Sequence, residues 1–587
     1  MSDAMNPAYT IPAITAIILA TVLIGALGLR ISRTTSDFYV ASRSVGPGLN
    51  AAAISGEYLS AASFLGIAGL LLVYGPNMLW YPFGFTAGYL VLLLLVAAPL
   101  RRSGAYTLPD FAEARLESRY VHRIASVFVV GVGWLYLVPQ LQGAGLTMTV
   151  ITGAPRWAGG LLVATVVTII VAAGGMRSIT FVQAFQYWLK LTALLVPAVF
   201  LLFAWQSHQG HHADLGRQLR FTERTQVTLS SPISVSPASP LHVTVTGTVD
   251  GRRYDAAPVD LTPGRHRIER GARLDFAAGT PVPDTDVLSG GDTSGASQTG
   301  PQPHTLYTTY SLIVATLLGT MGLPHVVVRF YTSPNGSAAR RTTVVVLALI
   351  GVFYLLPPVY GLLARLYAPD LVLSGDADAA VLMLPSRIIG GVTGELLGAL
   401  LSAGAFAAFL ATASGLTIAV TGVLTQHVLP SRNRPAWGVR RFRWVTLLAT
   451  GVPTAAQTVL GDLPVADSVG MAFALSASAF CPLLLLGIWW RRLTPQGATA
   501  GLLIGGGAAF AAVLATIAGG AGSGWWYSLL ASPALWSVPL AFLAMVLVSL
   551  ATQRSVPPST AAMMRRLHLP EDLTSLPTPL AAREADA

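Results

Sequence analysis

The stretch Gly56-Glu57-Tyr58-Leu59-Ser60-Ala61-Ala62-Ser63-Phe64-Leu65-Gly66 decides the predicted fold of this chain. It lies inside an apolar segment, from about 46 to 74, that is long enough to cross a membrane. It nevertheless carries a carboxylate, two serines and two bracketing glycines. Backbone that opens at membrane depth is tolerated only inside protein or along a cavity, and a carboxylate in a span points to a functional site. The stretch therefore predicts a broken helix that forms a binding site.

The composition is that of a polytopic membrane protein. The chain has 587 residues, of which 53% are hydrophobic and 11% charged, whereas soluble domains are about 25% charged. The net charge of +10 comes from arginines in short loops between apolar runs, which is the positive-inside pattern and not a nucleic-acid patch. A single cysteine, Cys481, excludes an internal disulfide and predicts a small buried hydrophobe.

Roughly thirteen segments are apolar and long enough to span a bilayer. We place them at 10–30, 46–74, 78–99, 123–150, 157–174, 181–205, 306–330, 342–367, 390–427, 441–460, 466–490, 497–518 and 533–552. The first is expected to be retained, because no basic region precedes it. The arginine bias predicts an outer N-terminus and an inner C-terminus.

One connecting segment, 206–305, is long enough to form a small domain. Leu241–Val249 alternates apolar and polar residues as a strand does, and Asp250-Gly251 is typical of a hairpin turn. The region 290–303 has the composition of a linker. We expect a small β-rich extracytoplasmic insert, with a decorative or assembly role favoured over a transport role.

A second interrupted span carries Gly319-Thr-Met-Gly-Leu-Pro-His325, followed by Arg329. Gly322 and Pro324 both weaken a helix. Two interrupted spans in different halves point to a transporter with a midplane site. If the repeat begins at 46–74, the span 306–330 opens the second half of a five-plus-five inverted repeat. His325 and Arg329 share a helix face, and we expect them to line an inner gate or vestibule, not a metal site.

Two further spans carry polar groups that admit two interpretations. On 390–427, the residues Ala408, Ala411, Thr412 and Gly415 nearly share a face, which suits either a binding surface or close helix packing. Lys190, the only lysine, lies roughly 14 Å into its span. A lysine at that depth is costly unless paired or neutral, so proton transfer and snorkelling both remain open.

These motifs resemble the solute:sodium symporter family over about 10–552, and its cation/acetate symporter branch in particular. The matching blocks, in order, are Ser36–Ser44, Tyr58–Gly66, Leu135–Gln140 with Gly143–Gly145, Gly174–Met176, and Gly319–His325 with Arg329-Phe330. The resemblance implies an all-α, LeuT-type inverted repeat with one extra helix before it and others after it.

Domain boundaries follow from combining the spans with this resemblance. They are 1–45 for the extra N-terminal helix and loop, 46–205 for the first repeat, 206–305 for the insert, 306–460 for the second repeat, 461–552 for additional helices, and 553–587 for a cytoplasmic tail.

The resemblance also implies a cation site, from which this chain departs. Backbone carbonyls of Gly56 and Leu59 would face Ala408, Ala411 and Thr412. Ala411, however, has no hydroxyl. Thr180 stands near where many members carry an aspartate, and Lys190 lies on the same helix. In a distantly related proton-coupled group with this fold, a lysine on that helix replaces the sodium ion.

The resulting expectation is a symporter of the cytoplasmic (inner) membrane that imports short monocarboxylates such as acetate, propionate or pyruvate. Sodium is favoured as the coupling ion and a proton is possible, with no other cofactor, no obligate protein partner and surrounding lipid. Another small solute such as proline is the alternative. A receptor would need a signalling domain, and a membrane enzyme a catalytic constellation, which the sequence does not reveal.

The candidate residues fall into two groups. Substrate contacts are expected from Tyr58, Ser60, Ser63, Tyr136, Gln140, Thr320 and Gly322. Proton coupling or gating is expected from Glu57, Lys190, His325 and Arg329.

Overall fold

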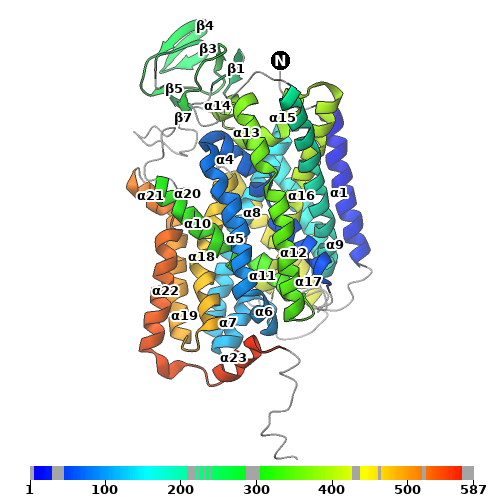
Figure 1. The fold of residues 1–587 in the computed structure, drawn as a ribbon, viewed down its shortest axis with the longest axis vertical. Coiled ribbons are helices and arrows are strands. Elements are labelled where there is room, and N and C mark those ends of the chain that lie inside the picture. The colour runs from blue at the N-terminus through cyan, green and yellow to red at the C-terminus, as the bar shows by residue number, and fades with distance from the viewer. Residues whose placement is uncertain are drawn as a thin grey trace, which may run out of the picture.

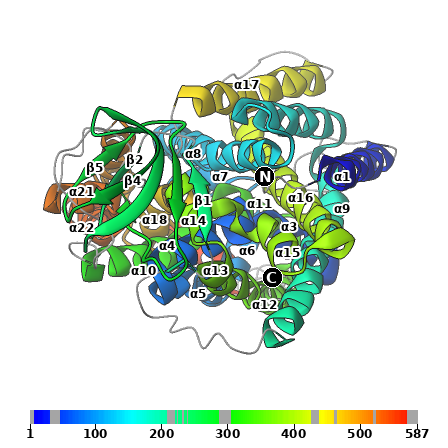
Figure 2. The ribbon, with the colours of Figure 1, turned by 90° about the horizontal axis from the view of Figure 1, so that it is seen from above.

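The protein is a bundle of helices that carries a small β-sheet at one end (Figure 1). The computed structural model describes residues 6–29, 45–207, 220–221, 224–229, 233–237, 239–285, 305–425, 437–459, 465–518 and 524–570. We call the two ends of the bundle the sheet end and the α23 end. Viewed from the sheet end, the sheet covers one side of the bundle, away from α1 (Pro7–Leu29) and α17 (Trp437–Val459) (Figure 2).

The remaining helices follow in chain order. Up to the sheet they are α3 (Pro47–Tyr58), η2 (Ala62–Gly66), α4 (Ile67–Tyr74), η3 (Gly75–Leu79), α5 (Trp80–Leu95), α6 (Ala97–Arg102), α7 (Leu108–Leu116), α8 (Arg119–Thr152) and α9 (Arg156–Ser207). After the sheet they are α10 (Thr305–Gly322), α11 (Pro324–Phe330), α12 (Gly336–Tyr354), α13 (Pro357–Tyr367), α14 (Asp370–Ser374), η4 (Ala377–Ala379), α15 (Ala380–Ile388), α16 (Gly391–Val423), α18 (Val465–Trp489), α19 (Pro495–Gly501), η6 (Leu502–Gly506), α20 (Gly507–Ile517), α21 (Trp525–Ala531), α22 (Ala534–Ala551), η7 (Gln553–Ser555) and α23 (Thr560–His568).

The described residues contain nine helices long and apolar enough to cross a membrane, or ten if the bent pair α10 and α11 counts as one span. The sequence predicted about thirteen, and that number is not confirmed. Part of the difference lies in continuous helical stretches that hold two predicted spans. One is the 52-residue α9, which is kinked at Gly175 (φ 61°, ψ −166°). At 1.5 Å per residue it is roughly twice as long as a bilayer is thick.

Both predicted helix interruptions are present. α3 ends at Tyr58, Leu59 leaves the helical region (φ −73°, ψ 89°), and the chain resumes as the π-helix η2. α10 ends at Gly322, Leu323 is extended (φ −65°, ψ 116°), and Pro324 begins α11 at a bend of 43°. Proline has no N–H to continue the first helix, but it suits the start of a second. We call these the first and second breaks.

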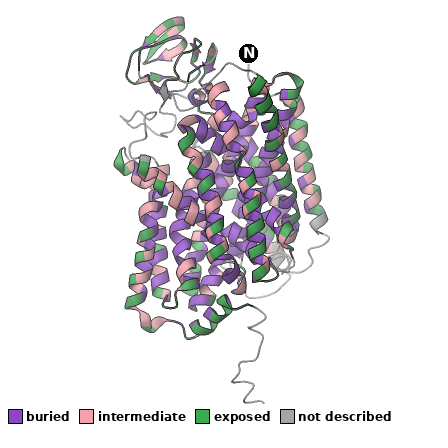
Figure 3. Cartoon of the chain, in the orientation of Figure 1, coloured by how far each residue is buried: buried purple, intermediate pink, exposed green. Residues whose placement is uncertain are grey.

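Buried residues fill the middle of the bundle, and exposed residues lie on its outer faces (Figure 3). Among the long helices of the described chain, α16 and α18 are the most enclosed, and 89% of the apolar stretch of each is buried. Large exposed apolar residues such as Leu23, Phe83, Phe203 and Leu547 lie on outer helices. An apolar exterior around a polar-containing core is expected where the surrounding solvent is lipid. Cys481 is buried, as predicted.

The sheet has seven strands and is antiparallel in all of its pairings. The strands are β1 (Thr225–Thr228), β2 (Ile233–Ser236), β3 (Leu241–Val249), β4 (Arg252–Leu261), β5 (His266–Ile268), β6 (Arg273–Phe276) and β7 (Asp284–Thr285). Their order is β1-β6-β3-β5-β2-β7, with β4 paired to β3.

The strand predicted at Leu241–Val249 and the hairpin that follows it are present in this sheet, whereas an extracytoplasmic insert stays a prediction. Asp250 (φ 49°) and Gly251 (φ 76°) both have positive φ, as a tight two-residue hairpin loop requires. Arg224 donates to Asp275 at 2.7 Å, and this hydrogen bond lowers the pKa of the Asp275 carboxyl. Leu373 of α14 belongs to the hydrophobic core of the sheet, so the insert is attached to the bundle. The predicted linker 290–303 lies outside the described residues.

Candidate functional site

The backbone carbonyls freed by the first break are held by a lysine. Lys190, fully buried on α9, donates from Nζ to the carbonyl of Leu59 at 2.7 Å and to that of Gly56. These are the two carbonyls for which the family resemblance implied a cation. A protonated amine and a monovalent metal ion both satisfy carbonyl oxygens, so the lysine stands where that ion was expected.

The face of α16 that carries Ala411 and Thr412 packs against the same break. Thr412 Oγ1 donates to the carbonyl of Glu57 at 2.6 Å, and Gln183 Nε2 donates to the carbonyl of Ala411 at 2.8 Å. At Gly415 there is no room for a side chain, because a Cβ would lie 1.9 Å from Glu57 Oε1. Ala408, one turn before Thr412, is also fully buried.

This donor set does not fit a sodium ion in the described arrangement. A hard cation needs several free oxygen ligands. The two carbonyls at Gly56 and Leu59 already accept from Lys190 Nζ, which takes the place between them, and Ala411 offers only a methyl group. Thr180, near the position of the family's aspartate, accepts from Arg329 Nη1 at 2.8 Å.

A buried ion pair lies beside the lysine. Arg329 Nε donates to Glu57 Oε2 at 2.6 Å, and both side chains are almost completely inaccessible. Arg329 also donates to Gln183 Oε1, and its carbonyl accepts from Asn50 Nδ2 at 3.3 Å. This carboxylate partner of Arg329 was not predicted, and the role of Arg329 at a gate or vestibule stays a prediction. The ion pair joins α11 to α3 inside the protein.

Between the two breaks lies a cluster of aromatic side chains, which we call the aromatic centre. It consists of Tyr58, Phe85, Tyr89, Tyr136 and Phe473, with ring centroids 4.6 Å apart for Tyr58 and Tyr89, 4.9 Å for Phe85 and Phe473, and 5.7 Å for Tyr136 and Phe473. The Tyr58 hydroxyl lies 3.1 Å from Thr320 Oγ1 and 3.2 Å from the carbonyl of Phe85. Tyr58 and Thr320, predicted from separate motifs, are therefore brought together.

His325 adds an unusual polar group to the aromatic centre. Its ring is fully buried, with its centroid 5.3 Å from that of Tyr136. Within the described part of the chain, neither of its nitrogens has a hydrogen-bond partner, and the same holds for the Tyr89 hydroxyl. Buried polar atoms are normally satisfied, so these groups are available to a ligand that enters the centre.

The other predicted substrate residues have mixed surroundings. Gln140 Oε1 accepts from the backbone N–H of Ala61 at 2.9 Å, next to the buried Ser60. Ser63 Oγ is 2.9 Å from the hydroxyl of Tyr354. Gly322 is a packing residue, since a Cβ there would lie 2.6 Å from Phe480 Cβ on α18.

Sequence reasoning missed several members of this site. Gln183 precedes Lys190 by seven residues, which is two helical turns, so helical periodicity could have found it. Phe473 could not be found in this way. It lies on α18, which was predicted to be an additional helix, yet Ser476 of α18 donates to the carbonyl of Gly319 at 2.9 Å.

Comparison with known proteins decides the family. A model of the sodium:solute symporter family matches residues 38–225 and 292–505. The chain belongs to this family. Members of the sodium:solute symporter family are membrane transporters, which agrees with the apolar helices and the buried central site.

Two relatives are similar to this chain over most of its length. The chain is 32% identical over 562 residues to a monocarboxylic acid transporter of Corynebacterium glutamicum, covering 92% of this chain and 90% of that one. It is 28% identical over 495 residues to an uncharacterized symporter of Bacillus subtilis, covering 84% and 83%.

Its fold matches that of a Na⁺-coupled sialic acid symporter solved in a substrate-bound outward-open state. The TM-score is 0.61 at 13% identity, with 92% of this chain and 98% of that chain covered.

Proposed function

We propose that this sodium:solute symporter family member imports short monocarboxylates together with a proton. The observation that carries the proposal is that Lys190 Nζ donates hydrogen bonds to the carbonyls of Gly56 and Leu59. Sodium was the coupling ion favoured from sequence. The geometry supports the proton instead, because lysine can release a proton where a bound metal ion can only dissociate.

The charges at the first break support an anionic substrate. With Lys190 protonated, the buried groups Lys190, Arg329 and Glu57 sum to one positive charge. An unbalanced buried charge is costly in a low-dielectric interior. A carboxylate at the neighbouring aromatic centre would offset that charge, so proton and anion would bind cooperatively. Similarity to the monocarboxylic acid transporter of Corynebacterium glutamicum supports the same substrate class.

The proton would move on and off Lys190 Nζ. Protonated Lys190 holds the break closed through two charge-assisted hydrogen bonds. After the protein opens inward, Nζ loses its proton to water, the bonds weaken, and the anion loses its counter-charge. One proton and one monocarboxylate would then cross together, and no net charge would cross the membrane.

Orientation follows from the arginine bias of the loops. We place the sheet end outside the cytoplasmic membrane and the α23 end inside. The described arginines at the α23 end include Arg101, Arg102, Arg491, Arg492 and Arg554. The N-terminus would then be outside.

Proteoliposomes test the proposal with pH, sodium and electrical gradients imposed separately. Labelled pyruvate is the better substrate, because acetate crosses lipid more readily as the neutral acid. We expect uptake driven by an inward proton gradient, unaffected by sodium or by membrane potential alone. Lys190→Met should abolish accumulation, while empty liposomes give the background.

Three results would contradict the proposal. Uptake that follows sodium and persists in Lys190→Met would identify sodium as the coupling ion. Uptake driven by membrane potential would refute electroneutral coupling. Competition by proline, with none by acetate, propionate or pyruvate, would refute the substrate class.

A further inference from the structure

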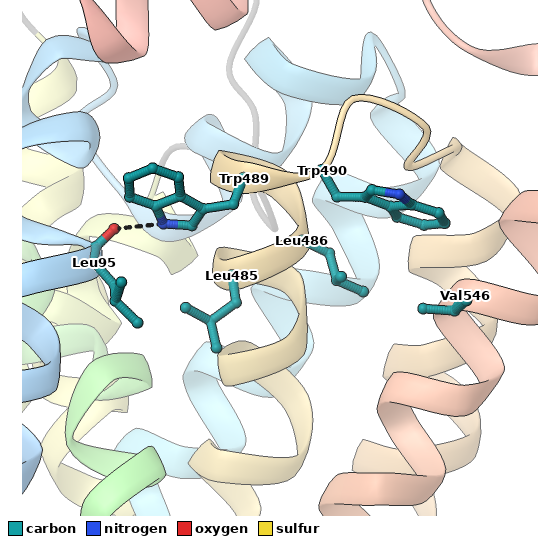
Figure 4. Close-up of a pocket in the computed structure, with 6 residues that line it drawn as sticks. All are labelled: Leu95, Leu485, Leu486, Trp489, Trp490 and Val546. Atoms are coloured by element: carbon teal, nitrogen blue, oxygen red, sulfur yellow. Dashed lines mark hydrogen bonds between the residues drawn. The ribbon is translucent and has the colours of Figure 1, made fainter.

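An apolar groove opens on the outside of the bundle, far from the aromatic centre. It has a volume of about 470 Å³ and is lined by Leu95 at the end of α5, by Leu485, Leu486, Trp489 and Trp490 at the end of α18, and by Val546 of α22 (Figure 4). Small-molecule sites are commonly of this size. Its walls come from three helices that are distant in sequence.

Two tryptophans mark the depth of this groove in the membrane. Trp489 is half exposed, its Nε1 donates to the carbonyl of Leu95 at 3.0 Å, and its ring contacts that of His568 at a centroid distance of 4.9 Å. Tryptophan concentrates at the boundary between hydrocarbon and water. The groove therefore begins at headgroup level and extends toward the acyl chains.

Arginines follow the groove directly. Arg491 and Arg492 come straight after Trp490, and both are exposed. Within the described ranges no ion pair is recorded for either of them. Arg565, also exposed, lies in the last turn of α23, near His568.

The loop that carries the arginine pair is anchored from behind. Arg115, fully buried, donates to the carbonyls of Trp490 at 3.2 Å and Arg491 at 3.3 Å. Gln553 donates to the carbonyl of Arg492 at 3.1 Å. The backbone is thereby held in place while the two guanidinium groups stay at the surface.

We propose that this groove binds an anionic phospholipid, with an acyl chain along the apolar wall and the phosphate on Arg491 and Arg492. Guanidinium groups bind phosphate through paired hydrogen bonds. The headgroup of a zwitterionic lipid carries a positive charge that the arginines repel, whereas the headgroup of an anionic lipid such as phosphatidylglycerol has no such charge. The occupant would touch α5, α18 and α22 at once.

Fluorescence quenching by brominated acyl chains tests the site directly. Full-length protein is placed in nanodiscs of phosphatidylcholine containing increasing fractions of brominated phosphatidylglycerol, or of brominated phosphatidylcholine in a parallel series. The chain has 12 tryptophans, so the signal of interest is the difference between wild type and Trp489→Phe/Trp490→Phe. We expect phosphatidylglycerol to quench this signal at a fraction about tenfold lower than phosphatidylcholine does.

Matched arginine variants separate a site from a general charge effect. Arg491→Gln/Arg492→Gln should abolish the preference for phosphatidylglycerol over phosphatidylcholine. Arg340→Gln/Arg341→Gln removes an exposed pair at the start of α12 and should leave it unchanged. Equal quenching by both lipids would overturn the proposal, as would a preference that survives Arg491→Gln/Arg492→Gln.

A second measurement covers the case in which the tryptophan variant fails to fold. Native mass spectrometry of wild type should retain phosphatidylglycerol over phosphatidylcholine, and Arg491→Gln/Arg492→Gln should lose that selectivity. Unchanged selectivity would refute the site. Neither readout depends on transport.

Discussion

Side chains pair freed carbonyls at both breaks, but the first break is charged and the second is not. At the first break, the carbonyls of Gly56, Glu57 and Leu59 accept hydrogen bonds from Lys190 and Thr412, and the N–H of Ala61 donates to Gln140. At the second break, the carbonyl of Gly319 accepts from Ser476, and neither ring nitrogen of the nearby His325 has a hydrogen-bond partner among the residues that the structure describes.

This difference suggests that the two breaks have different roles. The first break carries the charged side chains, and Lys190 and Thr412 pair its freed carbonyls, although Glu57 Oε1 and Ser60 Oγ have no hydrogen-bond partner among the described residues. The lysine lets this break respond to a proton. The second break carries no charge of its own beside the aromatic centre, where His325 packs on Tyr136 with both ring nitrogens unpartnered among the described residues, so it can respond to a ligand. A buried donor without a partner is destabilising until something binds it.

The largest expected effect comes from removing the counter-charge of the first break. Arg329→Gln leaves Glu57 buried and unpaired, which should cost about 3–5 kcal/mol of stability. Thermal unfolding of the purified protein measures the loss, and Arg340→Gln on the surface is the control. The double variant Glu57→Gln/Arg329→Gln should regain part of it. An unchanged melting temperature in Arg329→Gln would show that the pair does not hold this break.

A smaller effect is expected from crowding the first break. Gly415→Ala places a methyl group against the Glu57 carboxylate, since a Cβ there would lie 1.9 Å from Oε1. Overpacking of this kind costs about 1–3 kcal/mol, seen as a lower melting temperature. Gly131→Ala on α8 is the matched control, because no atom of the described residues lies within 4 Å of its Cβ position. Equal stability of the two variants would mean that α16 and α3 are not closely packed.

The second break should behave differently when its unmatched group is removed. His325→Phe deletes two unpartnered nitrogens, so stability should hold or rise, while KM for pyruvate rises about tenfold. Uptake kinetics and melting temperature are measured on the same preparation. A lower melting temperature with an unchanged KM would show that His325 is a structural residue. It would contradict the ligand-binding role assigned to the second break.

The smallest effect concerns the contact that joins the breaks. Tyr58→Phe removes the hydroxyl that lies 3.1 Å from Thr320 Oγ1, and a single neutral hydrogen bond is worth about 1 kcal/mol. Thr320→Val and the double variant complete a double-mutant cycle on melting temperature. A coupling energy of zero would mean that the two breaks are held independently.

Much of this architecture could be predicted from residues that act locally. Gly322 and Pro324 ended one helix where expected, and Asp250-Gly251 turned one hairpin, because backbone conformation at these positions depends mainly on the residue itself. The number of spans was less predictable, since kinks such as Gly175 leave two predicted spans in one continuous helix.

The composition of the site could not be predicted in this way, because it depends on which helices pack against one another. Its residues come from α3, α5, α8, α9, α10, α11, α16 and α18, and no periodicity within one helix shows which face meets another. Glu57 and Arg329 are 272 positions apart, so their ion pair left no local signal. The same holds for Phe473, whose helix was assigned to a later domain.

The amino-acid sequence was enough to predict a membrane protein with two broken helices, a lysine near the midplane of one span and no hydroxyl at Ala411. These properties follow from composition and local backbone preference. The folded structure was needed to show that Lys190 donates to the carbonyls of Gly56 and Leu59 and that Arg329 pairs with Glu57. Those contacts form only when helices pack, because burial makes a charged group take whichever partner the fold brings within reach.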